Sequence, residues 1–458
     1  MLGNEVCEII RFLYREIFTI SAIFVNCMEK KLILVIIAVF LTLSSCQTGI
    51  PKRDTRMDRT RLNIGAYILQ PYARSETHIK DLADCGIDFV ICIDNDREAL
   101  DLLEKYGVGA IVTGVVPGWW GGNGEVAGTL EKVNPLQDYE TAAASFEDHP
   151  AIWGIDIGDE PSALDFPYYG KVMERVQELF PNQFAFLNLY PNYASVAQNT
   201  DDQALSQLGT ATYEEHIKQY CQYIPADYLS YDFYYKVAGV QKDYANLRIV
   251  SDACHKNSLD MWITLQVNSF DPEVWISENE LRFQAFSALA FGASNISWAC
   301  YTAGWWSNQV VDGDGKKTQQ YDKLKTVNEE IHTIAERYMR YRNIETVCIG
   351  FDDTDMLEAS GLESSSELDF GSLVGLTADC PLLVGKMAAR KGDRNKALFI
   401  CVADDPYDEN PGNHTIRFTT KMRRVKAWGG NGPMKVKRTG NDNYELPVVS
   451  NQGVILEF

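Results

Sequence analysis

The sequence predicts a (β/α)8 barrel at residues 61–341, followed by a small all-β sandwich at residues 342–458. In the first region, eight strand-like runs alternate with amphipathic, helix-like segments. In the second, short strand-like runs follow one another closely and turn residues separate them. A doubly wound α/β sheet is the main alternative, but no glycine-rich phosphate loop follows the first strand.

The expected elements are defined by runs of apolar residues and by period. The barrel strands are expected at Leu62–Ile68, Asp88–Ile93, Val108–Thr113, Ile152–Gly158, Gln183–Tyr190, Tyr228–Tyr235, Met261–Asn268 and Asn295–Tyr301. Helices are expected between them, for example at Glu76–Cys85, Arg97–Tyr106, Tyr168–Phe180, Tyr213–Tyr223 and Glu280–Phe291. The sandwich strands are expected at Thr346–Phe351, Leu382–Ala388, Ala397–Ala403, His414–Thr419, Arg424–Trp428, Met434–Arg438 and Gly453–Phe458.

Several barrel strands become polar on one face toward their C-terminal ends. Side chains alternate along a strand, so Ser230, Asp232 and Tyr234 share one face of the sixth strand. The same alternation puts Thr264 and Gln266 on one face of the seventh strand, and Asn188 and Tyr190 on one face of the fifth. Parallel strands buried on both faces are normally almost entirely apolar. This polarity therefore predicts an active-site mouth.

The stretch from Trp153 to Pro161 carries the strongest functional signal. Ile155 and Ile157 fall on one face of the expected fourth strand, whereas Gly154, Asp156, Gly158 and Glu160 fall on the other. Pro161 suits the first turn of a following helix. Glu160 is thus expected at the carboxyl end of a barrel strand, where barrel enzymes place their chemistry. Alternatively, Asp159 and Glu160 merely supply negative charge near a helix start.

Asp159-Glu160-Pro161 resembles the acid/base strand of clan-A glycoside hydrolases, in which the motif is usually Asn-Glu-Pro. The resemblance implies a TIM barrel that hydrolyses glycosidic bonds, often with an appended β-sandwich. It also implies a nucleophilic glutamate at the end of the seventh strand, but this chain has Thr264-Leu265-Gln266-Val267 there. Since an amide cannot be that nucleophile, the double displacement typical of the clan is not supported.

Glycoside hydrolysis requires two carboxyl groups that flank the scissile bond. Glu160 is expected to be the general acid and Asp232 its partner. Asp94 and Asp271 are weaker candidates for the second carboxylate, and Asp156 would instead raise the pKa of Glu160 by like-charge proximity. Asp232 has an alternative role, in which it orients substrate or neighbouring side chains through hydrogen bonds.

Tandem tryptophans in two loops indicate a sugar-binding rim. Flat aromatic faces suit the apolar faces of sugar rings, and glycines next to them allow close approach. Burial of these tryptophans under their own loops is the alternative. The residues expected to bind substrate are Asp159, Asp156, Trp119, Trp120, Asn188, Tyr190, Tyr234, Gln266, Trp305 and Trp306.

The composition of the chain limits the classes of partner and cofactor that it is expected to bind. The formal net charge of −21 makes the chain a poor candidate for binding nucleic acid through phosphates. None of its six histidines has the spacing of a metal-ligand pair, so neither a metal nor another cofactor is expected. The expected partner is a carbohydrate.

The N-terminal region resembles a bacterial lipoprotein leader. A short basic segment from Met28 precedes the apolar run Leu32–Leu43, and Leu43-Ser44-Ser45-Cys46 resembles a lipobox. The resemblance implies cleavage before Cys46, lipid attachment to its thiol and anchoring in the outer membrane, as in lipoproteins of the Bacteroidetes type. Residues 1–27 are then an upstream extension and 47–60 a tether. The periplasmic and the external face both remain open, and an uncleaved anchor is the alternative.

Taken together, the sequence predicts a lipid-anchored glycoside hydrolase of the cell envelope that acts on oligo- or polysaccharides. The alternative is a glycan-binding lipoprotein whose barrel no longer turns over substrate. Gln266, at the position expected for the nucleophile, is the best argument for that alternative.

Overall fold

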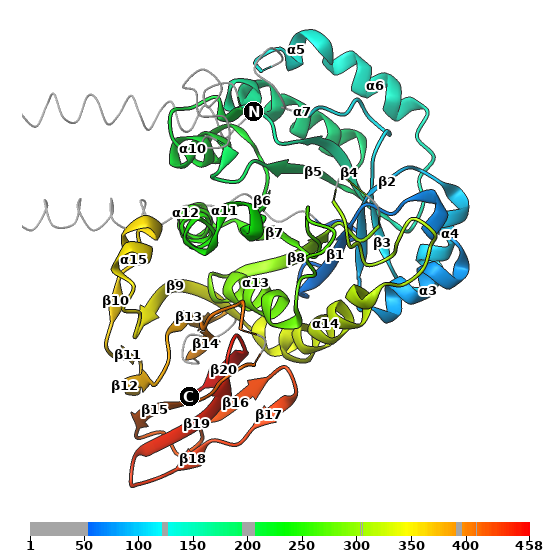
Figure 1. The fold of residues 1–458 in the computed structure, drawn as a ribbon. Helices are drawn as coiled ribbons and strands as arrows, with labels where there is room; N and C mark the ends of the chain where they lie inside the picture. Colours follow the sequence, from blue (N-terminus) through cyan, green and yellow to red (C-terminus); the bar gives the residue numbers. More distant parts are fainter. Residues whose placement is uncertain are drawn as a thin grey trace, which may run out of the picture. The chain divides into compact units, whose positions relative to one another are not determined.

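The computed structural model describes residues 54–120, 127–194, 207–302, 304, 306–390, 396–408 and 410–458. All of these residues belong to residues 50–458, which form one compact unit (Figure 1). The expected leader, with Cys46 and the preceding apolar run, lies outside the described residues. Within the described ranges, no helix is both long and apolar enough to span a bilayer.

A closed barrel of eight parallel strands forms the first part of the described chain, in the order β1 to β8, and β1 pairs with β8 to complete it. Its strands are β1 (Asn63–Tyr67), β2 (Phe89–Ile93), β3 (Gly109–Val112), β4 (Ile152–Asp159), β5 (Phe184–Leu189), β6 (Tyr228–Asp232), β7 (Asp260–Gln266) and β8 (Ala293–Ala299). Each overlaps the strand predicted from the sequence, so the (β/α)8 fold class is confirmed.

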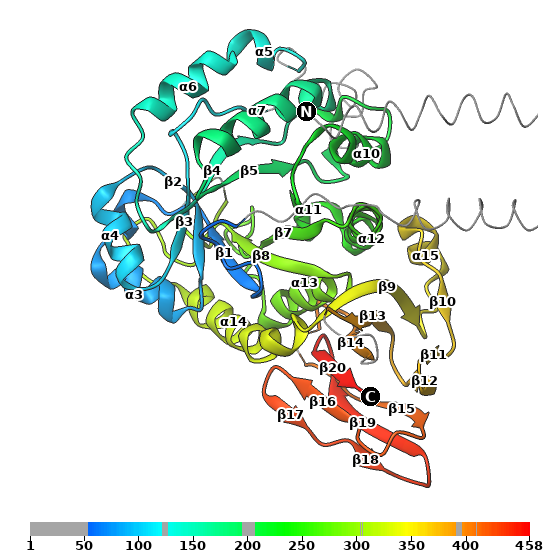
Figure 2. The same cartoon turned by 180° about the vertical axis from the view of Figure 1, so that it is seen from behind.

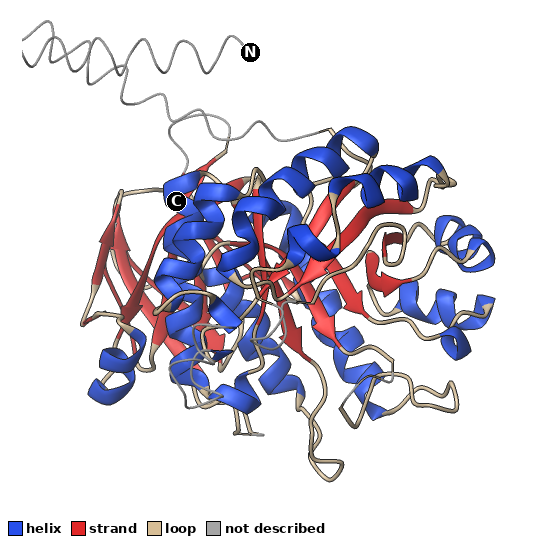
Figure 3. Ribbon diagram, turned by 90° about the horizontal axis from the view of Figure 1, so that it is seen from above, coloured by secondary structure: helices blue, strands red, loops and turns tan. Residues whose placement is uncertain are grey.

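Helices follow the barrel strands and surround them, as Figure 3 shows in blue around red strands. They are η1 (Pro71–Ala73), α3 (Glu76–Asp84), α4 (Arg97–Lys105), α5 (Leu130–Val133), α6 (Leu136–Ala144), η2 (Ala163–Asp165), α7 (Phe166–Leu179), α10 (Tyr213–Tyr223), α11 (Tyr235–Ala238), α12 (Val240–Asn257), α13 (Glu278–Ala290) and α14 (Gln319–Tyr338). Pro161 does not open a helix as predicted, because Ser162 is the N-cap of η2 and its side chain accepts from Leu164.

The N-terminal end of the barrel is closed by an arginine whose side chain is only 10% exposed. Arg59, just before β1, pairs with Asp227 and Asp260 at the starts of β6 and β7. Its guanidinium also lies over the rings of Tyr228 and Trp262, 5.9 and 5.3 Å from their centroids. These charges and rings fill the barrel floor. Space for a ligand is therefore left at the opposite end of the strands.

Two antiparallel sheets make up the C-terminal region. The larger has the order β10 (Ser364–Ser365), β9 (Tyr341–Ile349), β13 (Leu382–Ala389), β14 (Lys396–Val402), β20 (Gly453–Glu457), β16 (Lys426–Gly429) and β17 (Gly432–Met434), with β10 parallel to β9. The smaller has the order β11 (Leu368–Phe370), β12 (Leu373–Ala378), β15 (Asn413–Thr420), β19 (Asn443–Val449) and β18 (Lys437–Arg438). The predicted β-rich region is confirmed, whereas β10, β11, β12, β19 and the helix α15 (Thr354–Ser360) were not predicted.

The larger sheet is buried on both faces, because alternate residues of its strand β14 belong to two different cores. Ala397, Phe399 and Cys401 belong to the core shared with the barrel, and the intervening Leu398 and Ile400 to the core between the two sheets. Phe399 packs on Tyr338 of α14, with ring centroids 5.3 Å apart. Figures 1 and 2 show α13 and α14 between the barrel and these strands. Both helices thus tie the sandwich to the barrel.

Candidate active site

A cavity of about 420 Å³ lies at the C-terminal ends of the barrel strands. It is lined by side chains from β1, β4, β5, β6 and β7 and from the residues that follow these strands or β3. They are Tyr67, Trp120, Asp159, Glu160, Phe186, Asn188, Asp232, Tyr234 and Thr264. This is the end at which a (β/α)8 barrel can assemble side chains from several strands around one ligand.

A β-bulge in β4 brings two consecutive acidic residues to the cavity. The pairing register between β4 and β5 shifts between Asp156 and Gly158, after which Asp159 lies opposite Asn188. A bulge re-aims the side chains that follow it, so Asp159 and Glu160 both line the cavity despite their consecutive positions. Gly158 is required here, because a Cβ would lie 2.8 Å from the backbone oxygen of Trp119. Strict alternation along this strand therefore fails at its end.

Glu160 has a left-handed backbone conformation, with φ of +46°. This conformation is unfavourable for a residue with a Cβ and is typically retained where the surroundings enforce it. Here the backbone N–H of Glu160 donates to the carbonyl of Asn188 at 2.9 Å, and that of Asp159 donates to Trp119 at 2.8 Å. These bonds fix the turn that points the glutamate into the cavity.

Asn188 links two of the acids that line the cavity. Its Nδ2 donates to Asp232 at 2.8 Å and to Asp159 at 3.2 Å. Its Oδ1 accepts from Ser230 at 2.9 Å, which fixes the amide with its N–H groups toward the carboxylates. Tyr67 also hydrogen-bonds Asp159. The network holds the carboxyl groups of Asp159 and Asp232 in fixed positions beside Glu160.

Burial raises the pKa of every acid in this cluster, and repulsion by neighbouring acids adds to it for Glu160 and Asp232. Burial comes first for Glu160, and Asp232 and Asp159 add to it, so that its pKa lies well above the usual value. Burial and Asp159 raise the pKa of Asp232 to about 7, whereas the hydrogen bond from Asn188 opposes the shift. The pKa of Asp159 is raised to about 6, again chiefly by burial. At neutral pH the cluster can therefore hold a protonated and an ionised carboxyl group together.

Trp120 joins the aromatic rim directly to the acid. Its Nε1 donates to Oε2 of Glu160 at 3.1 Å, and the side chain is 57% exposed. A large exposed ring at the mouth of a cavity is costly unless a ligand covers it. Trp120 thus combines a stacking surface with a hydrogen bond to Glu160.

Of the other predicted aromatic residues that the structure describes, Tyr234 lines the cavity, and Trp119, Tyr190 and Trp306 do not. Trp119 is half-buried and contributes its backbone carbonyl to β4, and Tyr190 is buried. Trp306 is buried edge-on against Tyr234, with ring centroids 4.3 Å apart, so it supports a residue of the lining. Trp305 lies outside the described residues.

Gln266, at the end of β7, is buried and hydrogen-bonded within the fold. It is fully buried, its Oε1 accepts from the backbone N–H of Lys236, and its Nε2 donates to the carbonyl of Asn268. Its own backbone is paired with the side chain of Gln284. The amide is committed to backbone partners, so β7 contributes Thr264 to the cavity and Gln266 is not part of its lining.

The remaining acids are placed away from the cavity lining. Asp156 is half-buried below it, accepts from the backbone N–H of Gly158 at 3.1 Å, and has its pKa raised to about 7 by burial and by Asp159. Asp94 is exposed and pairs with Arg74, and Asp271 is exposed and accepts from the backbone of Glu273. Asp232 is therefore the one predicted partner of Glu160 that the cavity contains.

Three lining residues were not predicted as site residues. Phe186 and Thr264 lie on the strand faces that the sequence marked, on the same faces as Asn188 and Gln266 respectively. Tyr67 is the last residue of β1, and its strand has no other polar residue near its end. The sequence signal that could have identified Tyr67 is its position at the C-terminal end of a barrel strand.

Two groups in the described chain have ligand atoms close enough to hold a metal ion. They are Asp101 with Glu104 and His149, and Asp379 with Cys380 and His414. His149 already accepts from the backbone N–H of Ala151 through Nδ1, and its Nε2 faces Asp101 at 3.0 Å. Neither group contributes to the cavity lining.

No protein-family model and no curated protein sequence matches the chain. Among solved structures, a glycoside hydrolase family 5 mannosidase from Rhizomucor miehei is 11% identical, with a TM-score of 0.41, over 62% of this chain and 99% of that one. An α-L-fucosidase isoenzyme 2 from Paenibacillus thiaminolyticus is 9% identical, with a TM-score of 0.46, over 87% and 100%. A glucosidase from Croceicoccus marinus is 11% identical, with a TM-score of 0.41, over 87% and 96%.

These similarities are at the level of overall fold, and the chemistry has to be read from the side chains of this chain. The cavity combines a carboxyl group of raised pKa, two further carboxylates and an exposed indole. Such a set can protonate a leaving oxygen while a second carboxylate assists attack from elsewhere in the cavity.

Proposed function

We propose that this chain is a glycoside hydrolase that cleaves glycosidic bonds in oligo- or polysaccharides. The observation that carries the proposal is that Glu160 and Asp232, from the ends of β4 and β6, line the same cavity. The pKa of Glu160 is raised well above its usual value, and the pKa of Asp232 is raised to about 7. This pairing of a proton donor with an ionisable partner is what hydrolysis of an acetal requires.

In the proposed reaction, protonated Glu160 donates its proton to the glycosidic oxygen as the bond to the leaving sugar breaks. Ionised Asp232 acts on the anomeric carbon, either directly or as the base for a water molecule. Asp159 and Asn188 keep the two groups in different protonation states, since Asp159 raises both pKa values and Asn188 favours ionised Asp232. Trp120 stacks on a sugar ring next to the scissile bond.

The charge of the cavity selects the substrate. Its lining contains three acids and no arginine, lysine or histidine. A carboxylate or sulfate on a sugar next to these acids would be repelled without compensation. Neutral sugars, or sugars that carry an amine, are therefore the expected substrates.

The test is hydrolysis of a panel of oligosaccharides by the wild-type chain and by Glu160→Gln. Removal of the proton donor should reduce release of new reducing ends by about 10²–10⁴-fold, with circular dichroism unchanged. Full activity in a folded Glu160→Gln variant would remove the acid from this position. Asp94→Asn, at an exposed acid outside the cavity lining, is the matched control and should retain activity.

A second function, glycan binding without turnover, is favoured by one observation. The end of β7 supplies no carboxylate, since Gln266 is buried and bonded to backbone groups. Retardation of the protein in a glycan-containing gel, with no new reducing ends from any glycan in the panel, would support this binder over the hydrolase.

For its location, we propose a lipid anchor at Cys46 in the outer membrane. The support is the sequence Leu43-Ser44-Ser45-Cys46 after an apolar run, as described above. Metabolic labelling with a fatty acid should tag the wild-type protein and not Cys46→Ser, and only the wild type should sediment with membranes. Labelling of Cys46→Ser at the wild-type level would contradict the anchor.

A further inference from the structure

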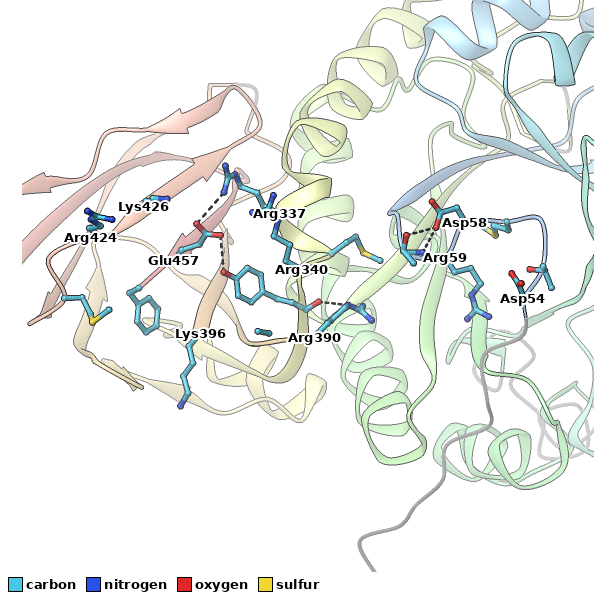
Figure 4. Close-up of a pocket in the computed structure, with 18 of the residues that line it drawn as sticks. Asp54, Asp58, Arg59, Arg337, Arg340, Arg390, Lys396, Arg424, Lys426 and Glu457 are labelled. Atoms are coloured by element: carbon cyan, nitrogen blue, oxygen red, sulfur yellow. Dashed lines mark hydrogen bonds and ion pairs between the residues drawn. The ribbon is translucent and has the colours of Figure 1, made fainter. Parts of the chain in front are cut away.

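A second and larger cavity, of about 1160 Å³, lies between the N-terminal end of the barrel and the C-terminal sandwich. Figure 4 shows its walls: the segment before β1, the end of α14, the starts of β14 and β16, and the end of β20. We call it the basic cleft, because eight of its lining residues are arginine or lysine and three are acidic. This composition is opposite to the net charge of −21 of the whole chain.

Half of these cations are neutralised by partners within the fold. Arg56 pairs with Asp148, Arg59 with Asp227 and Asp260, Arg340 with Glu336, and Arg337 with Glu457 at 3.6 Å. The guanidinium of Arg337 also lies over the ring of Trp428, 3.2 Å from its centroid. These side chains build the walls of the cleft and are not available to a ligand.

The other half have no acidic partner among the described residues. Arg390, Lys396, Arg424 and Lys426 are exposed, and none of them forms an ion pair within the described ranges. Of the three acids in the cleft, Glu457 is held by Arg337 and Tyr341, and Asp58 accepts from Thr60, a bond that leaves its charge in place. The four cations thus face two acidic charges, those of Asp54 and Asp58. An excess of unpaired positive charge therefore faces the opening of the cleft.

The connection between β15 and β16, together with the first residue of β16, extends this charge at one edge of the cleft. Lys421-Met422-Arg423-Arg424-Val425-Lys426 carries four cations within six residues. Met422 lines the cleft and is 42% exposed. Basic residues around an exposed apolar side chain are typical of a surface that rests on anionic lipid, since the cations meet headgroups and the apolar chain enters the interface.

The position of the cleft agrees with such a partner. Asp54, at one edge of the cleft, is eight residues after Cys46, so an anchored chain could lie at most about 29 Å from the membrane at this point. Arg59 marks the floor of the barrel, so the cleft lies at the opposite end of the strands from the catalytic cavity. A membrane at the basic cleft would leave the catalytic mouth facing away from it.

We propose that the basic cleft docks the protein on an anionic membrane surface through the phosphates of lipid headgroups. The cleft orients the barrel, so that the catalytic cavity opens toward polysaccharide outside the membrane. The choice of a membrane over a soluble polyanion rests on the proposed anchor at Cys46. The contact itself needs neither the anchor nor hydrolysis, so it can be tested without either.

The test is co-sedimentation of residues 50–458, the separate compact unit with its own cores, with lipid vesicles. Binding is compared on phosphatidylcholine alone and on phosphatidylcholine with phosphatidylglycerol. The double variant Arg424→Glu/Lys426→Glu reverses the unpaired charge, and Arg424→Gln/Lys426→Gln removes it. The matched control is Lys171→Glu/Lys218→Glu, which makes the same charge change on exposed barrel helices.

We expect binding that requires phosphatidylglycerol, weakens in high salt, falls at least about tenfold in both cleft variants, and changes little in the control. Circular dichroism checks the fold of each variant. If Arg424→Glu/Lys426→Glu does not fold, the result for Arg424→Gln/Lys426→Gln decides the test. Equal loss in control and cleft variants, or no preference for anionic vesicles, would overturn the proposal. So would binding to a soluble sulfated polysaccharide but not to vesicles. Unchanged hydrolysis by the cleft variants separates this test from that of the hydrolase.

Discussion

The side-chain amide of Asn188 donates a hydrogen bond of 2.8 Å to Asp232. This bond favours the ionised form of Asp232, against burial and the charge of Asp159, which raise its pKa to about 7. In the proposed reaction, Asn188 is thus a positioning residue, because its hydrogen bond lowers the pKa of the carboxyl group proposed as the base.

Asn188→Ala should shift the acidic limb of the pH–rate profile to higher pH, because Asp232 loses the bond that stabilises its ionised form. Loss of a hydrogen bond to a charged group should lower kcat by roughly 10- to 100-fold at neutral pH. The pH dependence of kcat/KM is the measurement. Ser230→Ala, which removes the donor to the other side of the same amide, should have a smaller effect in the same direction. A profile with unchanged limbs would show that Asn188 only packs.

Asp159→Asn should move both limbs of the pH–rate profile to lower pH. Its negative charge raises the pKa of Glu160 and of Asp232, so neutralising it lowers both. A pH profile of kcat/KM over pH 4 to 9 checks this, and an upward shift of either limb would contradict the assigned electrostatics.

Two substitutions of Trp120 should separate its two roles. Trp120→Phe keeps an aromatic ring but removes the N–H that donates to Glu160, so the pKa of Glu160 and the alkaline limb should rise. Trp120→Ala removes the ring as well and should raise KM by roughly 3- to 10-fold, the amount expected for a lost aromatic contact. If KM is the same in both variants and the wild type, no sugar stacks on this residue.

Asp243→Asn should stabilise the protein at high pH. Asp243 lies in α12 and is 2% exposed, and burial raises its pKa from 3.8 to about 8. Because the folded state holds a proton that the unfolded state has released, stability falls as pH rises between those values. The variant should gain roughly 5 kcal/mol in free energy of unfolding at pH 8.5 relative to its effect at pH 4. Urea unfolding measures this, with exposed Asp252→Asn on the same helix as the control. A gain that is the same at both pH values would contradict burial of a protonated acid.

Much of the fold could be predicted because the period of apolar residues is a local signal. The eight barrel strands are short and strongly apolar, and helices separate them regularly. β12 and β19 were missed because their apolar residues are interrupted by glycine or proline, Gly375 and Pro447, and contribute only one face to a core. β19 lies between β15 and β18 and still contains Pro447. Since proline is normally confined to edge strands, the sequence of β19 does not reveal that it forms an interior strand.

The candidate site was predictable in part for the same reason. Asp232 and Asn188 follow from alternation along regular strands, and both line the cavity. Asp159 reaches it through a bulge, and a register shift depends on the neighbouring strand. Gln266 follows the predicted alternation but turns to backbone partners on the segment after β6, a long-range contact that no local pattern contains.

The central claim is that Glu160 protonates the leaving oxygen, and leaving-group dependence tests it most directly. Glu160→Gln should be compared with the wild type on aryl glycosides of one sugar that differ only in the acidity of the released phenol. A strongly acidic phenol needs no proton to leave, whereas a weakly acidic one does. We predict a loss of kcat/KM of about 10²–10⁴-fold for the poor leaving group and little loss for the good one. An equal loss on both substrates would contradict the role of Glu160 as the general acid.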